Sequence, residues 1–337
     1  MSVSVTSRRV PLHRGWVLLA VAVVLFAAAA PAAGARIGRE DAVVPQRPTT
    51  DAPFARAQAG LAYDPGRQVT LLFGGEYLGA YMNDTWAWNG TKWRLQAPPR
   101  SPSPRAGMGM AYDAARKQIV VFGGFNGHGY LNDTWIWNGR AWKKLAIPSA
   151  PKARANMGMV WDDARQVIVM FGGGTANIFN DTWTWDGTAW TRQAPASSPG
   201  KRSDMGMAYD PLHQQVVMFG GQGFNFYGDT WTWDGTNWTK QNPSSSPIAR
   251  WGPGMGYDRV SDQTVLFGGD VLSGPLDDTW TWDGTNWTER FPASSPAARF
   301  RFPMDWSPNN QLILFGGNGA VVYGDTWTWD GSAWMLR

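Results

Sequence analysis

Residues 229–238 read Asp-Thr-Trp-Thr-Trp-Asp-Gly-Thr-Asn-Trp, and the 337-residue chain repeats this pattern with small changes in five other places. An arginine lies upstream of each copy and opens the repeating unit. The aspartates that open the copies are Asp84, Asp133, Asp181, Asp229, Asp278 and Asp325, and the arginines are Arg56, Arg105, Arg154, Arg202, Arg250 and Arg299. Both series are spaced by about 48 residues, which indicates a repeat architecture rather than one irregular core.

The second unit shows how each repeat is expected to fold. Residues 108–112 alternate large and small side chains, which predicts a strand, and residues 118–122 read Gln-Ile-Val-Val-Phe, a pattern typical of a strand buried on both faces. Residues 133–137 alternate again, and Asn138-Gly139 turns the chain towards a fourth strand near Trp142. No part of the unit has helical spacing.

A four-stranded sheet with two apolar faces must be covered on both sides. Six such sheets packed around an axis cover one another, so the sequence predicts an all-β, six-bladed β-propeller with four antiparallel strands in each blade. We expect this domain to span residues 55–337, with repeats starting near residues 56, 105, 154, 202, 250 and 299. The repeated tryptophans, Trp233 among them, should fill the spaces between blades, and the sixth blade should be built largely from its own strands.

The N-terminal 35 residues have the pattern of an export signal. A basic stretch ends at Arg14, an apolar run follows from Trp16 to Ala30, and small residues precede Arg36. Cleavage after Ala35 is favoured, and an uncleaved membrane anchor is the alternative. Residues 36–54, with three prolines, are expected to form a linker.

The charge and the lack of cysteine exclude several classes of protein. Loss of the three arginines in the signal lowers the formal charge from +4 to +1, which leaves no basic surface for nucleic acid. The sequence contains no cysteine, which rules out disulfides and thiolate chemistry. Packing alone must hold the domain.

The repeats resemble kelch repeats, including those of the central domain of galactose oxidase. The resemblance is carried by the Gly-Gly pair after each apolar strand (Gly123-Gly124 in the second unit), by the opening arginine and by the aromatic pair that flanks each turn. The turn between the aromatic residues is shorter than is usual in kelch units, which often carry Tyr where Trp233 stands. The resemblance implies a kelch-type propeller.

The loops that follow the Gly-Gly pairs differ between copies and share one face of the predicted propeller. They are rich in aromatic and amide side chains, which suit stacking on sugars or gripping an extended chain. The candidate ligand-binding residues in these loops are Tyr77, Tyr81, Phe125, Asn126, His128, Tyr130, Asn177, Phe179, Phe224, Asn225, Phe226, Tyr227 and Tyr323. Asp204 and Arg301 stand where other copies have Gln, Gly or Asn, and are expected to line one mouth of the axial channel.

Catalytic chemistry finds little support in the sequence. A copper oxidase like galactose oxidase would need a cysteine-linked tyrosine and paired histidines, whereas this chain has only His13, His128 and His213. The last two are expected on opposite faces of the propeller. The repeated Arg and Asp residues suggest a structural role, since six identical active sites are implausible.

The sequence therefore predicts an exported, non-catalytic kelch propeller without metal or cofactor. It should bind a glycan or a protein on the variable-loop face, with a membrane contact only through an N-terminal anchor. The alternatives are an enzyme, of the galactose oxidase or sialidase type, with an unrecognised site, and a structural spacer.

Overall fold

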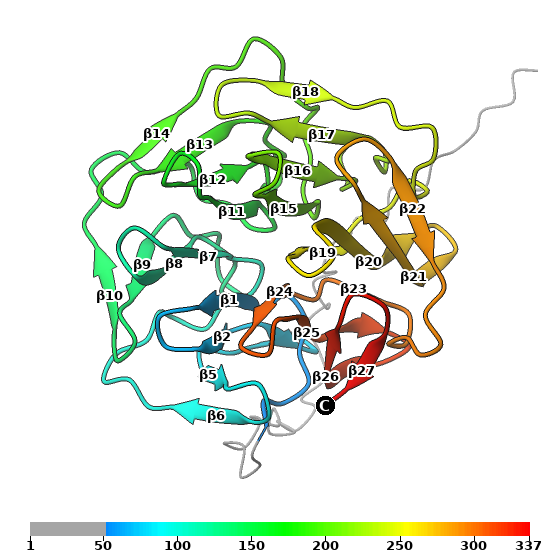
Figure 1. The fold of residues 1–337 in the computed structure, drawn as a ribbon. Coiled ribbons are helices and arrows are strands. Elements are labelled where there is room, and N and C mark those ends of the chain that lie inside the picture. The colour runs from blue at the N-terminus through cyan, green and yellow to red at the C-terminus, as the bar shows by residue number, and fades with distance from the viewer. Residues whose placement is uncertain (1–51) are drawn as a thin grey trace, which may run out of the picture. The chain divides into compact units, whose positions relative to one another are not determined.

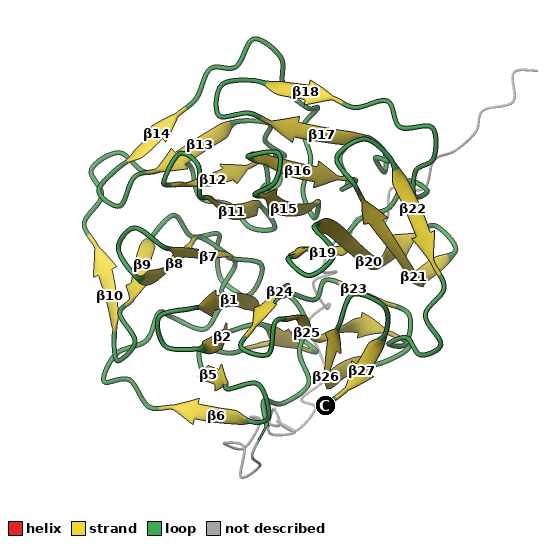
Figure 2. Ribbon diagram, in the orientation of Figure 1, coloured by secondary structure: helices red, strands yellow, loops and turns green. Residues whose placement is uncertain are grey.

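The computed structural model describes residues 52–337, which form a six-bladed β-propeller of antiparallel sheets (Figure 1). The predicted fold class is confirmed. Strands and loops account for all of this region (Figure 2), and no helix in it is long and apolar enough to cross a membrane. The predicted signal peptide, and the linker up to residue 51, lie outside the described residues.

Each of the first three blades is a sheet of four strands. Blade 1 contains β1 (Gly60–Asp64), β2 (Val69–Phe73), β5 (Thr85–Trp88) and β6 (Trp93–Gln96), and its loop carries the hairpin of β3 (Glu76–Tyr77) and β4 (Ala80–Tyr81). Blade 2 contains β7 (Gly109–Asp113), β8 (Gln118–Phe122), β9 (Thr134–Trp137) and β10 (Trp142–Leu145). Blade 3 contains β11 (Gly158–Asp162), β12 (Val167–Phe171), β13 (Thr182–Trp185) and β14 (Trp190–Arg192).

The last three blades follow the same plan. Blade 4 contains β15 (Gly206–Asp210), β16 (Gln215–Phe219), β17 (Thr230–Trp233) and β18 (Trp238–Lys240). Blade 5 contains β19 (Gly254–Asp258), β20 (Gln263–Val271), β21 (Gly274–Trp282) and β22 (Trp287–Arg290). Blade 6 contains β23 (Arg299–Phe300), β24 (Met304–Ser307), β25 (Gln311–Gly319), β26 (Val322–Trp329) and β27 (Trp334–Leu336), so it is built from its own strands as expected.

The strands of each blade run outward from the axis in chain order. Figure 1 shows β1, β7, β11, β15, β19 and β24 around the centre and β6, β10, β14, β18, β22 and β27 at the perimeter. The turns after the first and third strands share one face, here called the turn face. The loops after the Gly-Gly pairs share the other, here called the variable-loop face. Only the loops on the variable-loop face differ strongly in sequence from blade to blade.

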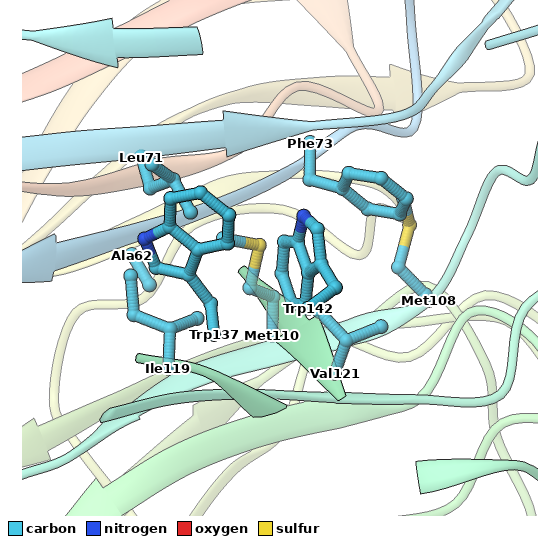
Figure 3. Close-up of a cluster of buried hydrophobic side chains, with 9 residues drawn as sticks. All are labelled: Ala62, Leu71, Phe73, Met108, Met110, Ile119, Val121, Trp137 and Trp142. Atoms are coloured by element: carbon cyan, nitrogen blue, oxygen red, sulfur yellow. The ribbon is translucent and has the colours of Figure 1, made fainter. Parts of the chain in front are cut away.

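The core lies between neighbouring blades. Between blades 1 and 2, Leu71 and Phe73 of β2 pack against Trp137 and Trp142 of blade 2 (Figure 3), and Met108 and Met110 fill the inner end of the same space. The second and third tryptophans of each repeat are buried in all six blades. The first tryptophan is half-buried in five of them, so the predicted interior position holds fully for two of the three.

A hydrogen bond repeated in all six blades ties each outer strand to the blade before it. The indole N–H of Trp238 donates to the hydroxyl of Thr182 at 2.9 Å, and the same bond joins the third tryptophan of each repeat to the preceding Asp-Thr-Trp threonine at 2.8–3.0 Å. In blade 1 the donor is Trp93 and the acceptor is Thr326 of blade 6, 233 residues away. This bond is one of several that join blade 1 to blade 6 and close the ring.

Candidate functional site

The mouth of the axial channel on the variable-loop face is surrounded by a closed ring of backbone hydrogen bonds. Each blade donates one N–H to a carbonyl of its neighbour, at 2.7–2.9 Å, through Gln58, Gly107, Asn156, Asp204, Gly252 and Arg301. All six residues have positive φ, between 53° and 65°. Gly107 and Gly252 take this left-handed conformation at little cost, while side chains at the other four positions project at the mouth.

Asp204 and Arg301 bridge this mouth. Arg301 Nε of blade 6 donates to Asp204 Oδ1 of blade 4 at 2.7 Å, and the guanidinium also stacks 4.6 Å from the ring centre of Trp251. The side chain of Asp204 is 3% exposed and accepts further bonds from Ser203 and Gln222. The two residues thus meet at the channel mouth where the sequence placed them, and their charges are satisfied by each other.

Three aromatic residues of the predicted site stack on the buried arginines of the repeats. The guanidinium carbons of Arg154, Arg202 and Arg299 lie 4.3, 3.9 and 4.2 Å from the ring centres of Phe179, Tyr227 and Tyr323. These distances are short enough for cation–π attraction. All three rings are partly exposed.

Other predicted aromatic residues form clusters between adjacent loops. Tyr81 contacts Phe125 edge-on at 5.7 Å, and Phe125 packs against Tyr130 at 4.9 Å. Tyr77 stacks edge-on with Phe54, and Phe226 lies 6.3 Å from Trp251, the ring over which Arg301 lies. Asn126 accepts backbone N–H bonds from His128 and Gly129 and so shapes its own loop.

The remaining predicted residues lie at exposed loop tips. His128, Asn177, Phe224 and Asn225 are all exposed, and Phe224 is 98% exposed. His213 lies in the turn after β15, on the turn face. No group of three or more His, Cys, Asp or Glu side chains within residues 52–337 is arranged to hold a metal ion.

The repeated Arg and Asp form one ion pair in each blade, in which the arginine is buried and the aspartate is partly buried. Arg154 donates to both oxygens of Asp181, at 2.6 and 2.9 Å, and to the carbonyls of Gly172 and Lys152. Burial alone would raise the pKa of Asp181, but hydrogen bonds from Arg154 and Trp183 hold the pKa below its usual value. The aspartates of blades 1, 2, 4 and 6 are shifted in the same direction for the same reasons. The pairs anchor the Gly-Gly corner of every blade.

A large cavity opens on the turn face. It has a volume of about 640 Å³ and is lined by the inner strands and their first turns. Its wall carries one aromatic residue from each blade, namely Tyr63, Tyr112, Trp161, Tyr209, Tyr257 and Trp306, and its deeper part carries Met110, Met159, Met207, Met255 and Met304. We call this cavity the axial funnel. The cavity at the opposite mouth measures only about 140 Å³.

The funnel departs from six-fold symmetry at three charged residues, Asp163, Arg259 and Asp305. Asp305 lies on the inner strand of blade 6 and Arg259 on the first turn of blade 5, and both line the cavity. Burial raises the pKa of Asp305, against the opposing effects of N–H bonds from Trp306 and Tyr63 and of the charge of Arg259.

The sequence analysis predicts a site on the variable-loop face and does not identify the funnel. A signal was present, because every repeat carries Tyr or Trp just before the end of its first strand, and only the sixth has a carboxylate at the preceding position. Within a single repeat, the alternation of the strand is enough to explain this aromatic residue. Its position at the cavity wall follows from the closure of the ring, which no single repeat reveals.

Comparisons with known proteins agree with this architecture. Residues 40–195 match the KLHDC2/KLHL20/DRC7 Kelch-repeats domain family. A solved structure described as "Structure of YjhT" has a TM-score of 0.66 with 17% sequence identity, and the alignment covers 85% of this chain and 99% of that one. At this identity the likeness concerns the fold alone. No curated protein matches the sequence significantly.

The repeats, the family match and the six-bladed ring together define a kelch-type β-propeller. The family match over residues 40–195 and the fold together support a kelch-repeat propeller family. This fold is consistent with a binding or a structural module.

Proposed function

We propose that this kelch propeller is an exported, non-catalytic binding module whose partner docks on the variable-loop face. One observation carries the proposal: five of the six loops on this face carry an exposed apolar side chain. These are Leu78, Tyr130, Phe224, Leu272 and Val321, with exposed fractions of 78, 42, 98, 95 and 62%. Binding residues concentrate on loops held by a rigid scaffold.

The chemistry of the loop tips favours a protein partner over a glycan. Leu78, Leu272 and Val321 are aliphatic, and aliphatic side chains do not offer the flat faces that stack on sugar rings. Several of the aromatic rings that could stack on a sugar are instead engaged with buried arginines, as Tyr227 is with Arg202. A glycan therefore becomes the second outcome of the test below.

We expect the double variant Phe224→Asp/Leu272→Asp to lose its partner while keeping its fold. Both side chains are almost fully exposed, so their replacement should change the stability by no more than about 0.5 kcal/mol each. Partner capture by the full chain, followed by mass spectrometry, would be compared with capture by the variant, alongside a glycan array.

The matched control for this test is Leu212→Asp, because Leu212 is 62% exposed in the first turn of blade 4, on the turn face. It should capture the same partner as the wild type. Equal capture by the double variant would refute the proposal for this face, and loss of array signals alone would assign a glycan.

Export is the part of the proposal that rests on the N-terminal sequence. We expect the protein recovered outside the cytoplasm to have the mass of a chain that begins at Arg36, because small residues precede that position. Intact mass spectrometry of the secreted fraction measures this directly. A full-length mass in the membrane fraction would instead support the uncleaved anchor.

A further inference from the structure

The axial funnel on the turn face carries one feature that the repeat does not explain. The third residue of the inner strand has a small or aliphatic, uncharged side chain in the first five blades, whereas the equivalent position in the sixth blade, the second residue of β24, is Asp305. The equivalents are Ala62, Ala111, Val160, Ala208 and Gly256. A carboxylate has thus been placed at one point of a cavity wall that is otherwise uncharged at this level.

Asp305 is held in place by backbone donors and not by a cation. Its Oδ2 accepts the N–H of Tyr63 across the seam between blades 6 and 1, at 3.0 Å, and its Oδ1 accepts the N–H of Trp306 at 2.7 Å. Among residues 52–337 no Lys, Arg or His nitrogen lies within 4.0 Å of it. The carboxylate is fixed in orientation and can accept a further hydrogen bond.

The aromatic wall around Asp305 suits a positive charge. Ring faces of Trp and Tyr attract cations through their quadrupole, and several rings together can recognise alkylammonium groups. The protein's own Arg259 shows this attraction. Its side chain is exposed, and its guanidinium carbon lies 5.4 Å from the ring centre of Trp306.

Carboxylates behind the wall add to the negative potential on the side of blades 4 and 5. In blades 1, 2 and 3 the buried aspartate that ends the first strand pairs with an arginine, as Asp162 does with Arg165. In blade 4 the partner of Asp210 is His213. In blade 5 Asp258 accepts from the Ser261 hydroxyl and forms no ion pair within the described part of the chain.

We propose that the axial funnel binds a ligand through an organic ammonium group, with the nitrogen close to Asp305 and its alkyl substituents against the aromatic wall. The cavity volume of about 640 Å³ falls within the range of about 300–1,000 Å³ that is usual for small-ligand sites. The site lies on the face opposite the loops assigned to the partner, so it is independent of the proposed docking surface.

The competing explanation is that Asp305 only fastens blade 6 to blade 1. In that case its replacement would lower the stability of the fold, and the wild type itself would not bind an organic cation in the funnel. The charge of the ligand separates the two explanations, because a structural carboxylate gives no reason for the funnel to select a cation.

The test compares choline with 3,3-dimethylbutan-1-ol, which has the same shape without the charge. Isothermal titration of the full chain should give saturable choline binding with a dissociation constant of about 1 mM or tighter. The alcohol should bind at least about tenfold more weakly, because it lacks the charge that the carboxylate and the rings attract. Failure of choline to bind at this level, or equal binding of the alcohol, would overturn the proposal.

Variants then assign the site. Asp305→Asn should weaken choline binding by about tenfold or more, since it removes the charge, while it keeps one oxygen that can accept a backbone N–H bond. Arg259→Ala should bind choline as well as the wild type or better, because it removes a competing cation. Loss of binding in Arg259→Ala, or wild-type binding in Asp305→Asn, would contradict the assignment.

Two further variants guard against misfolding and non-specific effects. Asp305→Ala introduces the residue found at this position in three other blades. It removes the charge in a second way, which tests the proposal if Asp305→Asn does not fold. Phe291→Ser changes a side chain that is 84% exposed just after β22, away from the funnel lining, and should leave choline binding unchanged. Thermal melts of each variant report folding separately from binding.

Discussion

Trp233→Ala is expected to lower the free energy of unfolding by about 3–5 kcal/mol, the usual cost of deleting a large aromatic side chain from a packed core. Trp233 has no exposed surface and lies with Val169 and Phe171 of blade 3 in the space between blades 3 and 4. Its ring centre is 5.5 Å from that of Trp238. Chemical denaturation of the full chain, followed by circular dichroism, measures the change.

Two conservative variants show which part of this effect comes from packing. The indole N–H of Trp238 donates to Thr182, whereas that of Trp233 has no acceptor within the described residues. Trp238→Phe should therefore cost about 1–3 kcal/mol more than Trp233→Phe, because it also leaves the Thr182 hydroxyl without its donor. A change below about 1 kcal/mol in Trp233→Ala would contradict the interior position.

The fold could be predicted from the sequence because each repeat contains the patterns of all four strands of one blade. The run at residues 118–122 matches β8, and the alternation at residues 133–137 matches β9 to within one residue. The requirement to bury both faces of a four-stranded sheet then leaves a closed ring as the solution. The Trp93 bond to Thr326 could not be assigned beforehand, since it depends on the number of blades that close the circle.

The site was harder to derive because side chains of the same type have different roles. Tyr227 and Phe224 belong to one loop, yet Tyr227 stacks on Arg202 whereas Phe224 is exposed. Sequence alone places both in a variable loop and cannot tell which ring meets an arginine. Asp204 and Arg301 stand out in the sequence because they break the repeat. Asp305 breaks it in the same way, but only closure of the ring places it at a cavity wall.

Arg154→Met is expected to lower the free energy of unfolding at neutral pH by about 3–5 kcal/mol, because it leaves the carboxylate of Asp181 buried without its cation. Arg154 is fully buried and its side chain donates four hydrogen bonds, two of them to Asp181. The double variant Arg154→Met/Asp181→Asn should be less destabilised than the single one, since no unpaired charge remains. Additive losses would show that the two side chains act independently.

The same pair predicts how this difference changes with pH. In the wild type the pKa of Asp181 lies below the unfolded value of about 3.9, so the stabilisation from its ionised form is complete above that value and is lost as the pH falls through the folded pKa. In Arg154→Met, burial without the guanidinium should raise the pKa of Asp181. Lowering the pH therefore neutralises the unpaired carboxylate in the variant, whereas in the wild type it weakens the ion pair. The stability difference between wild type and variant should therefore shrink from pH 7 towards about pH 3, as measured by denaturant melts at each pH. A difference that stays constant or grows would mean that the loss comes from packing of the arginine side chain and not from its charge.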